Sequence, residues 1–265
     1  MNRSYSELNA FMWCPMRWHY GYAEGLEAVE KKPILNLGVV MHKVWAVYYR
    51  TKPENRSETL LLTSAKAALA DVRLEEEKLE ELWRDAEATC RAYFRQYSAD
   101  VHLFGKTETK MDGGKAVIDL LVDHPTHRLM VIDHKVGEKL NTLRWELDFQ
   151  TRHYCYLTGA TTFAVNQVGV TKRAGSHNFL FNREVYPISV EEAAAAEAEL
   201  EMQKELLELA IEADCFPRRG GGCDSYCDYA RLCIAEFHSV PDTDWIRKTQ
   251  FAKRERRGED ATQED

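Results

Sequence analysis

One short segment, residues 129–135, constrains this chain more than any other. Its sequence is LMVIDHK, an apolar run that ends in an acid and an amine. The length of the run and the Gly137 that follows it indicate a strand of a mostly buried sheet. Because side chains alternate between the two faces of a strand, Asp133 and Lys135 point to the same side.

The residues before this run predict its partner strand. Residues 116–123, AVIDLLVD, read as a strand, and the turn-forming HPTH joins the two. A hairpin centred on Thr126 places Asp119 opposite Asp133, with Cβ atoms about 5 Å apart. Two carboxylates this close repel each other unless a cation lies between them, and an ammonium beside them suits a metal-dependent hydrolase that polarises a water. The hairpin therefore predicts a divalent-metal phosphodiesterase site.

Composition sets the class of protein. The chain has 265 residues, and 45% of them are hydrophobic, which suffices for a real core. The N-terminus starts no hydrophobic signal region and no run approaches the ~20 apolar residues of a membrane span, so we expect a cytoplasmic protein. In that compartment seven cysteines indicate metal ligands or buried thiols rather than disulfides.

The formal charge of −8 is weak evidence against nucleic-acid binding. The acidic residues are concentrated in two predicted helices, 74–87 and 190–212. They are most simply explained as the solvent-exposed faces of these helices. Arg218 and Arg219, next to three glycines, are candidates for phosphate contacts.

Patterning predicts an α/β domain with a helical insertion. Ser4 and Glu7 have capping-box spacing, and Pro15 is expected to break the first helix at Cys14. The remaining elements are predicted as follows: a helix from Asn36 to Arg50, helices within 57–97, strands at 104–111, 115–123 and 128–135 with a tight turn at 111–114, a helix at 143–157 closed by Gly159, strands at 162–170 and 178–188, and a helix opened by Ser189 and Glu192.

The predicted domain organisation follows from this order. Residues 1–240 are expected to form a single domain, in which 51–100 are the helical insertion. Residues 1–20 and 215–238 are expected to form a cysteine-cluster subdomain. Residues 241–265 are a basic and then acidic tail, which we expect to be partly disordered.

A dense cysteine cluster lies near the C-terminus, Cys223-x3-Cys227-x5-Cys233, and Cys14 supplies a possible fourth thiolate. Four thiolates suit either a 4Fe–4S cluster or a structural zinc ion, and spacing alone slightly favours zinc. We interpret the other cysteines as buried thiols, with Cys215 as the reserve ligand.

The acidic residues form part of a longer ordered set. It comprises Gly38-x3-His42, Glu108, Asp119, the VIDHK of residues 131–135, and Gln150-x3-Tyr154. With this set the chain resembles the PD-(D/E)XK nuclease superfamily in its RecB-like branch. The resemblance implies a restriction-endonuclease-like core, a mixed central sheet flanked by helices in αβββαβ order. It also implies that Mg²⁺ or Mn²⁺ is bound and that DNA phosphodiesters are hydrolysed.

The resemblance implies a metal site. Asp119 and Asp133 would be the primary ligands, with the main-chain carbonyl of His134, since hard divalent cations prefer oxygen. His42 would complete the shell from a neighbouring helix. Glu108 would orient a metal-bound water or hold a second ion.

The same resemblance implies catalytic roles beside the metal. Lys135 would position the nucleophilic water and stabilise charge in the transition state. Gln150 and Tyr154 would hold Lys135 or contact the DNA backbone.

The cysteines add a second resemblance. The contexts SELxxFxxCPxR at residues 6–17 and CxYxxxC at 227–233 are similar to the iron–sulphur RecB-like nucleases, namely the AddB nuclease domain and the CRISPR spacer-acquisition exonucleases. This implies a 4Fe–4S cluster on Cys14, Cys223, Cys227 and Cys233 that joins the two ends. One spacing departs from the pattern: three residues, not two, separate Cys223 from Cys227.

We therefore expect a metal-dependent DNA nuclease with an iron–sulphur cluster, an exonuclease acting on single-stranded or frayed ends. Protein partners in CRISPR adaptation or recombination are possible on the same resemblance. The alternative is a non-catalytic module of the same fold that binds DNA ends or serves assembly. The intact set of Asp119, Asp133 and Lys135 argues against it, because a binding protein does not need that lysine.

Overall fold

The computed structural model describes residues 3–29, 32–111, 116–140, 145–173, 175–223 and 227–254. The chain divides into two compact units, and each is described by itself. The sheet unit is Lys32–Glu197, and the cysteine unit is Met1–Lys31 together with Ala198–Asp265. The predicted boundaries of a single domain over 1–240 stay a prediction.

The sheet unit is built on one five-stranded sheet in the order β2-β3-β4-β5-β6. Neighbouring strands are antiparallel except for β4 and β5, which are parallel. This mixed sheet flanked by helices confirms the predicted fold class. The strands are β2 (Gly105–Met111), β3 (Ala116–His124), β4 (Arg128–Gly137), β5 (Thr162–Arg173) and β6 (Ser176–Pro187).

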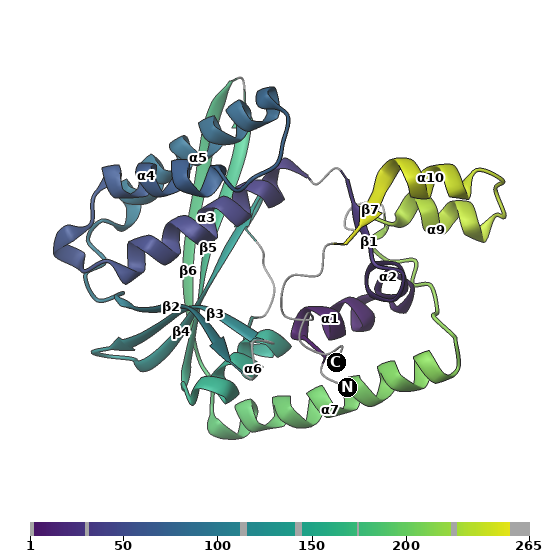
Figure 1. Ribbon diagram of the computed structural model, residues 1–265. Helices are drawn as coiled ribbons and strands as arrows, with labels where there is room; N and C mark the ends of the chain where they lie inside the picture. The colour runs from purple at the N-terminus through teal and green to yellow at the C-terminus, as the bar shows by residue number, and fades with distance from the viewer. Residues whose placement is uncertain are drawn as a thin grey trace, which may run out of the picture. The chain divides into compact units, whose positions relative to one another are not determined.

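Helices cover both faces of this sheet. On one face α3 (Pro33–Arg50), α4 (Glu58–Leu69) and α5 (Glu76–Tyr97) lie together (Figure 1) and enclose the larger core with side chains such as Leu120 and Ile132. On the other face α6 (Phe149–Thr158) packs against Ile118, Val131 and Phe163. Short 3-10 turns occur at Pro53–Asn55 and Trp145–Leu147. Helix α3 lies against β2, β3 and β4, and the helical insertion packs on α3 and on β6.

Local chemistry sets the helix ends. The helix expected from Asn36 begins earlier, because Pro33 lacks an N–H and its fixed φ suits the first helical position. The helix expected from residue 143 begins only at Phe149, where the Asp148 side chain accepts from Gln150 N at 2.8 Å. Gly159 ends it in the left-handed region at φ 70°, as predicted.

The long helix α7 (Val190–Glu212) begins with the predicted capping box. Ser189 Oγ accepts from Glu192 N at 3.1 Å, and Ser189 N donates to Glu192 Oε2 at 2.8 Å. Residues 112–114 of the predicted tight turn and 143–144 of the predicted helix lie outside the described ranges. Of the helices that the structure describes, none is long and apolar enough to cross a membrane.

The cysteine unit begins with α1 (Tyr5–Trp13) and α2 (Pro15–Trp18). Ser4 caps α1 as predicted, but the Glu7 carboxylate departs from the capping box and accepts from Trp18 Nε1 at 3.1 Å instead. Cys14 is extended at φ −162° between the two helices, which confirms the predicted break.

The C-terminal residues of this unit are folded as far as Lys253. A π-helical turn (His19–Ala23) and β1 (Leu26–Ala28) follow α2, and the later elements are α9 (Ala230–Phe237), α10 (Thr243–Gln250) and β7 (Phe251–Lys253). Strands β1 and β7 pair antiparallel. The predicted tail from residue 241 thus contains a helix and a strand, while 255–265 lie outside the described residues.

Candidate metal centre

Glu108 and Asp119 lie at a gap in the pairing of β2 with β3. In the β2–β3 ladder Thr107 pairs with Leu120 and Thr109 with Ile118, and no pair joins the intervening Glu108 and Asp119. Glu108 has a positive φ of 49°, which takes it out of regular strand geometry. At such a break the side chains need not alternate strictly between the two faces of the sheet. The two carboxylates can therefore point in directions that a regular strand would not allow.

The β3–β4 hairpin has the predicted register. Leu120 pairs with Ile132 and His124 with Arg128, so the hairpin is centred on Thr126. The ladder ends at Leu120 and Ile132, one pair before Asp119 and Asp133 would meet. The two aspartates therefore lie where the strands stop pairing, rather than as a regular cross-strand pair.

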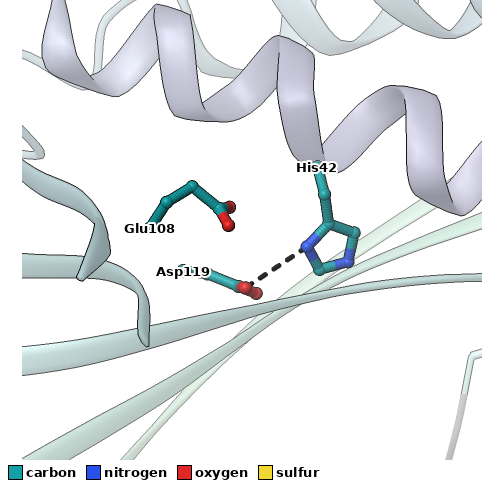
Figure 2. A group of neighbouring side chains, drawn as sticks. All are labelled: His42, Glu108 and Asp119. Atoms are coloured by element: carbon teal, nitrogen blue, oxygen red, sulfur yellow. Dashed lines mark ion pairs between the residues drawn. The ribbon is translucent and has the colours of Figure 1, made fainter. Parts of the chain in front are cut away.

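Three side chains from different elements converge at this break. His42 on α3, Glu108 on β2 and Asp119 on β3 offer ligand atoms that all lie within 4.8 Å of one another. His42 Nδ1 is 3.3 Å from Asp119 Oδ1, and Figure 2 shows the Glu108 carboxylate turned toward the same point. Among the described residues this is the one group of three or more such side chains that could hold a metal ion.

Lys135 lies in a second set of contacts beside the first. Its Nζ is 2.8 Å from Asp133 Oδ2 and donates to Gln150 Oε1 at 3.1 Å. Gln150 Nε2 in turn donates to the Tyr154 hydroxyl at 2.9 Å. Two residues of β4 and two of α6 thus form a continuous polar chain, in which Gln150 orients the amine.

Charges couple the two sets of contacts. Burial by itself would raise the pKa of Asp119, but the hydrogen bond and charge of His42 lower it to about 2. Burial by itself would lower the pKa of His42, and the hydrogen bond to Asp119 leaves it raised. Burial and then the charge of Asp119 raise the pKa of Glu108. The Asp119 carboxylate is therefore ionised and can bind a cation.

Burial and neighbouring charges also set the pKa values of Asp133 and Lys135. Burial raises the pKa of Asp133, and Lys135 offsets part of that effect. Burial alone would lower the pKa of Lys135, but Asp133 leaves it raised. Lys135 is therefore an ammonium at neutral pH, able to donate hydrogen bonds and stabilise negative charge.

His134 contacts both the Asp119 carboxylate and the aromatic side chains of α3. Its main-chain N–H donates to Asp119 Oδ2 at 2.8 Å. Its imidazole is stacked on the Tyr49 ring with centroids 5.5 Å apart and lies 6.3 Å from the His42 ring, and burial lowers its pKa to about 3. The predicted role of the His134 carbonyl stays a prediction.

The structure brings together the other side chains predicted for the sheet. They are His42, Glu108, Asp119, Asp133, Lys135, Gln150 and Tyr154. Carboxylate oxygens with one imidazole and a nearby ammonium fit a hard divalent cation and an anionic ligand such as a phosphate. Asp123, on the same strand as Asp119, is exposed at the hairpin end.

The four predicted cysteine ligands all belong to the cysteine unit. Cys14 is buried, and Cys223, Cys227 and Cys233 are partly exposed. Burial raises the pKa of Cys227, to which the charges of Cys223 and Cys14 also contribute. Within the described part of the chain these thiols do not form a tight group like that of His42. Cys215 is exposed, which corrects the interpretation that it is buried, whereas Cys90 and Cys155 are buried as expected.

The fold and this site define a class, the metal-binding α/β proteins with acidic residues and a lysine on neighbouring strands. A family model described as the PD-(D/E)XK nuclease superfamily matches residues 2–234. The chain belongs to the PD-(D/E)XK nuclease superfamily. Membership implies metal-dependent nuclease activity and, with it, DNA binding.

Comparison with individual proteins adds little. No curated protein matches the chain. The crystal structure of SSO0001 is similar at 15% identity, covering 74% of this chain and 84% of its own, with a TM-score of 0.30.

Sequence patterns missed the residues behind the motif. Asn166 is fully buried on β5 and contacts the His134 ring, 2.9 Å from its Nδ1. The available signal was the pair Asn166-Gln167 within the otherwise apolar TFAVNQVGV, since amides in a buried strand need partners.

Proposed function

We propose that this protein is a Mg²⁺- or Mn²⁺-dependent DNA exonuclease that acts on single-stranded or frayed ends. We further propose that Cys14, Cys223, Cys227 and Cys233 hold a structural 4Fe–4S cluster. The observation that carries the proposal is the group of His42, Glu108 and Asp119, whose ligand atoms lie within 4.8 Å of one another, together with the Asp133–Lys135 pair beside it.

The chain's own groups divide the work at this site. Asp119, Asp133 and His42 would hold the ion, with Glu108 orienting a water or a second ion. A divalent ion held there would polarise a water and a phosphate oxygen. The charged Nζ of Lys135, fixed by Asp133 and Gln150, would hold the attacking water and stabilise the charge that develops on the phosphate.

Tyr154 contributes through Gln150. Because the Tyr154 hydroxyl receives the Gln150 amide N–H, Gln150 Oε1 is left facing Lys135. Among the described residues Asp133 and Gln150 pair with two of the three hydrogens on Nζ, and the third would be offered to a substrate atom. This geometry supports a positioning role for Gln150 and Tyr154.

The cysteine assignment is supported by the motif contexts at residues 6–17 and 227–233. On one zinc ion four thiolates lie about 3.8 Å apart, as bonds of about 2.3 Å at tetrahedral angles require. In a 4Fe–4S cluster each thiolate binds a different iron, so the sulphur atoms are further apart. The distances between the four sulphur atoms in the metal-loaded protein therefore distinguish the two cofactors.

The test is a nuclease assay with Mg²⁺ or Mn²⁺ on end-labelled linear and circular single-stranded DNA. We expect release of labelled ends from the linear substrate, no cleavage of the circle, and loss of activity in Asp133→Ala and Lys135→Ala. Lys78→Ala is the control, since Lys78 is an exposed lysine on α5 that pairs with Glu75. Unchanged cleavage in both site variants would refute the assignment, and cleavage of the circle would refute the exonuclease.

Anaerobic purification tests the cysteine assignment separately. A brown protein with iron and sulphide supports the cluster, and a colourless protein containing zinc refutes it. DNA binding without turnover in either metal would favour the non-catalytic DNA-end-binding module.

A further inference from the structure

A row of polar side chains crosses the sheet directly behind the catalytic strand. His134 on β4 is in register with Asn166 on β5, and Asn166 is in register with Arg183 on β6. Asn166 is fully buried and His134 is 2% exposed. Buried polar groups of this kind are costly unless each has its partner.

Hydrogen bonds fix the orientation of the central amide. Arg183 Nε lies 3.1 Å from Asn166 Oδ1, and a guanidinium only donates, so this atom is the amide oxygen. The amide nitrogen then lies 2.8 Å from the Tyr93 hydroxyl and 2.9 Å from His134 Nδ1. Since an amide nitrogen only donates, His134 Nδ1 accepts and the neutral ring carries its proton on Nε2.

The far end of the row is anchored to the helices. Arg183 pairs with Asp100 and donates to the Tyr49 hydroxyl at 3.3 Å. The Tyr49 ring stacks on His134, and the Trp45 ring lies 4.9 Å from His134 between centroids. Two aromatic rings of α3 therefore pack against the imidazole, and the Asn166 amide of β5 hydrogen-bonds to its edge.

This anchored ring belongs to the residue between Asp133 and Lys135. The His134 main-chain N–H also donates to Asp119 Oδ2 at 2.8 Å. His134 therefore connects Asp119, Asp133 and Lys135 to this row of polar side chains. It lies beyond the last pair of the β3–β4 ladder.

We propose that Asn166 and Arg183 are positioning residues, which hold the His134 peptide so that Asp119, Asp133 and Lys135 keep their geometry for the ion. The inference rests on the proposed function of that site. Partners behind metal ligands commonly change metal affinity or activity by 10- to 100-fold when they are removed.

The test compares Asn166→Ala with Leu61→Ala, a control on α4 whose apolar side chain is buried in the larger core. Mn²⁺ affinity is measured by calorimetry, and the backbone amide and ring nitrogens of His134 by NMR. We expect Asn166→Ala to weaken Mn²⁺ binding about tenfold or more, to shift the His134 amide signal, and to lower kcat more than KM rises. Leu61→Ala should lower the melting temperature without these effects.

A conservative variant keeps the proposal testable if Asn166→Ala does not fold. In Asn166→Asp the carboxylate only accepts, so the His134 ring must carry a proton on Nδ1, and Mn²⁺ affinity should stay closer to wild type than in Asn166→Ala.

Three results would overturn the proposal: an Nε2-only proton in Asn166→Asp, an unmoved His134 amide in Asn166→Ala, or equal Mn²⁺ affinity in Asn166→Ala and wild type. A wild-type protein that neither binds Mn²⁺ nor cleaves DNA would refute the proposed function and, with it, the metal-positioning role. A wild type that binds or cleaves while Asn166→Ala is unaffected refutes the positioning role alone.

Discussion

The sheet unit and the cysteine unit prepare their ligands in different ways. In the sheet unit, α3 and β3, which contribute side chains to the larger core, and the edge strand β2 bring His42, Glu108 and Asp119 within 4.8 Å. In the cysteine unit the thiols lie on a chain bend, in a loop region and on a short helix, beside a small apolar cluster of Tyr20, Tyr229, Leu232, Ala235, Ile246 and Phe251.

The two sites differ in what determines the positions of their ligands. Backbone pairing and packing determine the positions of the carboxylates, so their site is organised by the protein. The cysteine unit has few buried apolar side chains, and small units of that kind commonly depend on a metal or cluster for part of their stability. We therefore expect the two regions to respond differently to loss of their inorganic partners.

The largest effect is expected from Lys135→Met, which keeps the length of the side chain but removes its charge. We expect kcat to fall by about 10²- to 10³-fold, since the ammonium acts on charge that develops in the transition state. Mn²⁺ affinity should be unchanged or tighter, because a positive charge near the ion is lost. Single-turnover cleavage and calorimetry on the same preparation check this, and loss of Mn²⁺ binding would contradict it.

Loss of the cluster should affect the cysteine unit most. Cys227→Ser is expected to lose iron and to unfold at a lower temperature, while Mn²⁺ affinity at the sheet changes by less than about twofold, within the range expected for independent sites. Cys215→Ser is the matched control, since Cys215 is exposed and outside the proposed ligand set. Iron content, melting temperature and calorimetric Mn²⁺ affinity check these three outcomes. Loss of iron from Cys215→Ser would show that the ligand set is wrong.

A pH effect should come from the buried His134. Its pKa is about 3 in the folded protein and about 6.5 in an unfolded chain. Between these values the unfolded chain binds a proton that the folded chain does not, so stability is present above pH 6.5 and is lost as the pH falls. The contribution is about 1.4 kcal/mol per pH unit.

Replacing His134 with Phe removes this titration. The slope of unfolding free energy against pH between pH 4 and 6 should decrease by up to about 1.4 kcal/mol per unit. Urea unfolding at several pH values measures it. An unchanged slope would mean that His134 is protonated in the fold or accessible to solvent.

The smallest effect is expected from Arg247→Ala in the cysteine unit. Arg247 on α10 pairs with Glu24 and Glu236, which helps to hold the C-terminal strand against β1. Because these groups are about a quarter exposed, we expect a loss of about 1 kcal/mol. Thermal unfolding of the cluster-containing protein checks this, and a much larger loss would mean that the β1–β7 pair determines stability more than the cysteines do.

Sequence patterns predicted the sheet unit well because its signals are local. Alternation, turn residues and caps predicted all five strands of the sheet and the register about Thr126. The break at Glu108 was not predictable, because a positive φ in a residue other than glycine depends on tertiary contacts.

The cysteine unit was harder for the same reason. The β1–β7 pair joins two strands of three residues each, from opposite ends of the chain, too short to give a pattern. The row behind the motif was also missed, because contacts of Asn166 with His134 and Arg183 come from strand order, which is not a local property.

Mn²⁺ binding to the sheet unit's aspartates tests the central claim most directly. Calorimetry on the full chain would compare wild type with Asp119→Asn and Asp133→Asn, and with Asp123→Asn as the exposed control on the same strand. The account predicts affinity at least about tenfold weaker in the first two variants and unchanged in the control. Equal affinity in all four proteins would contradict it.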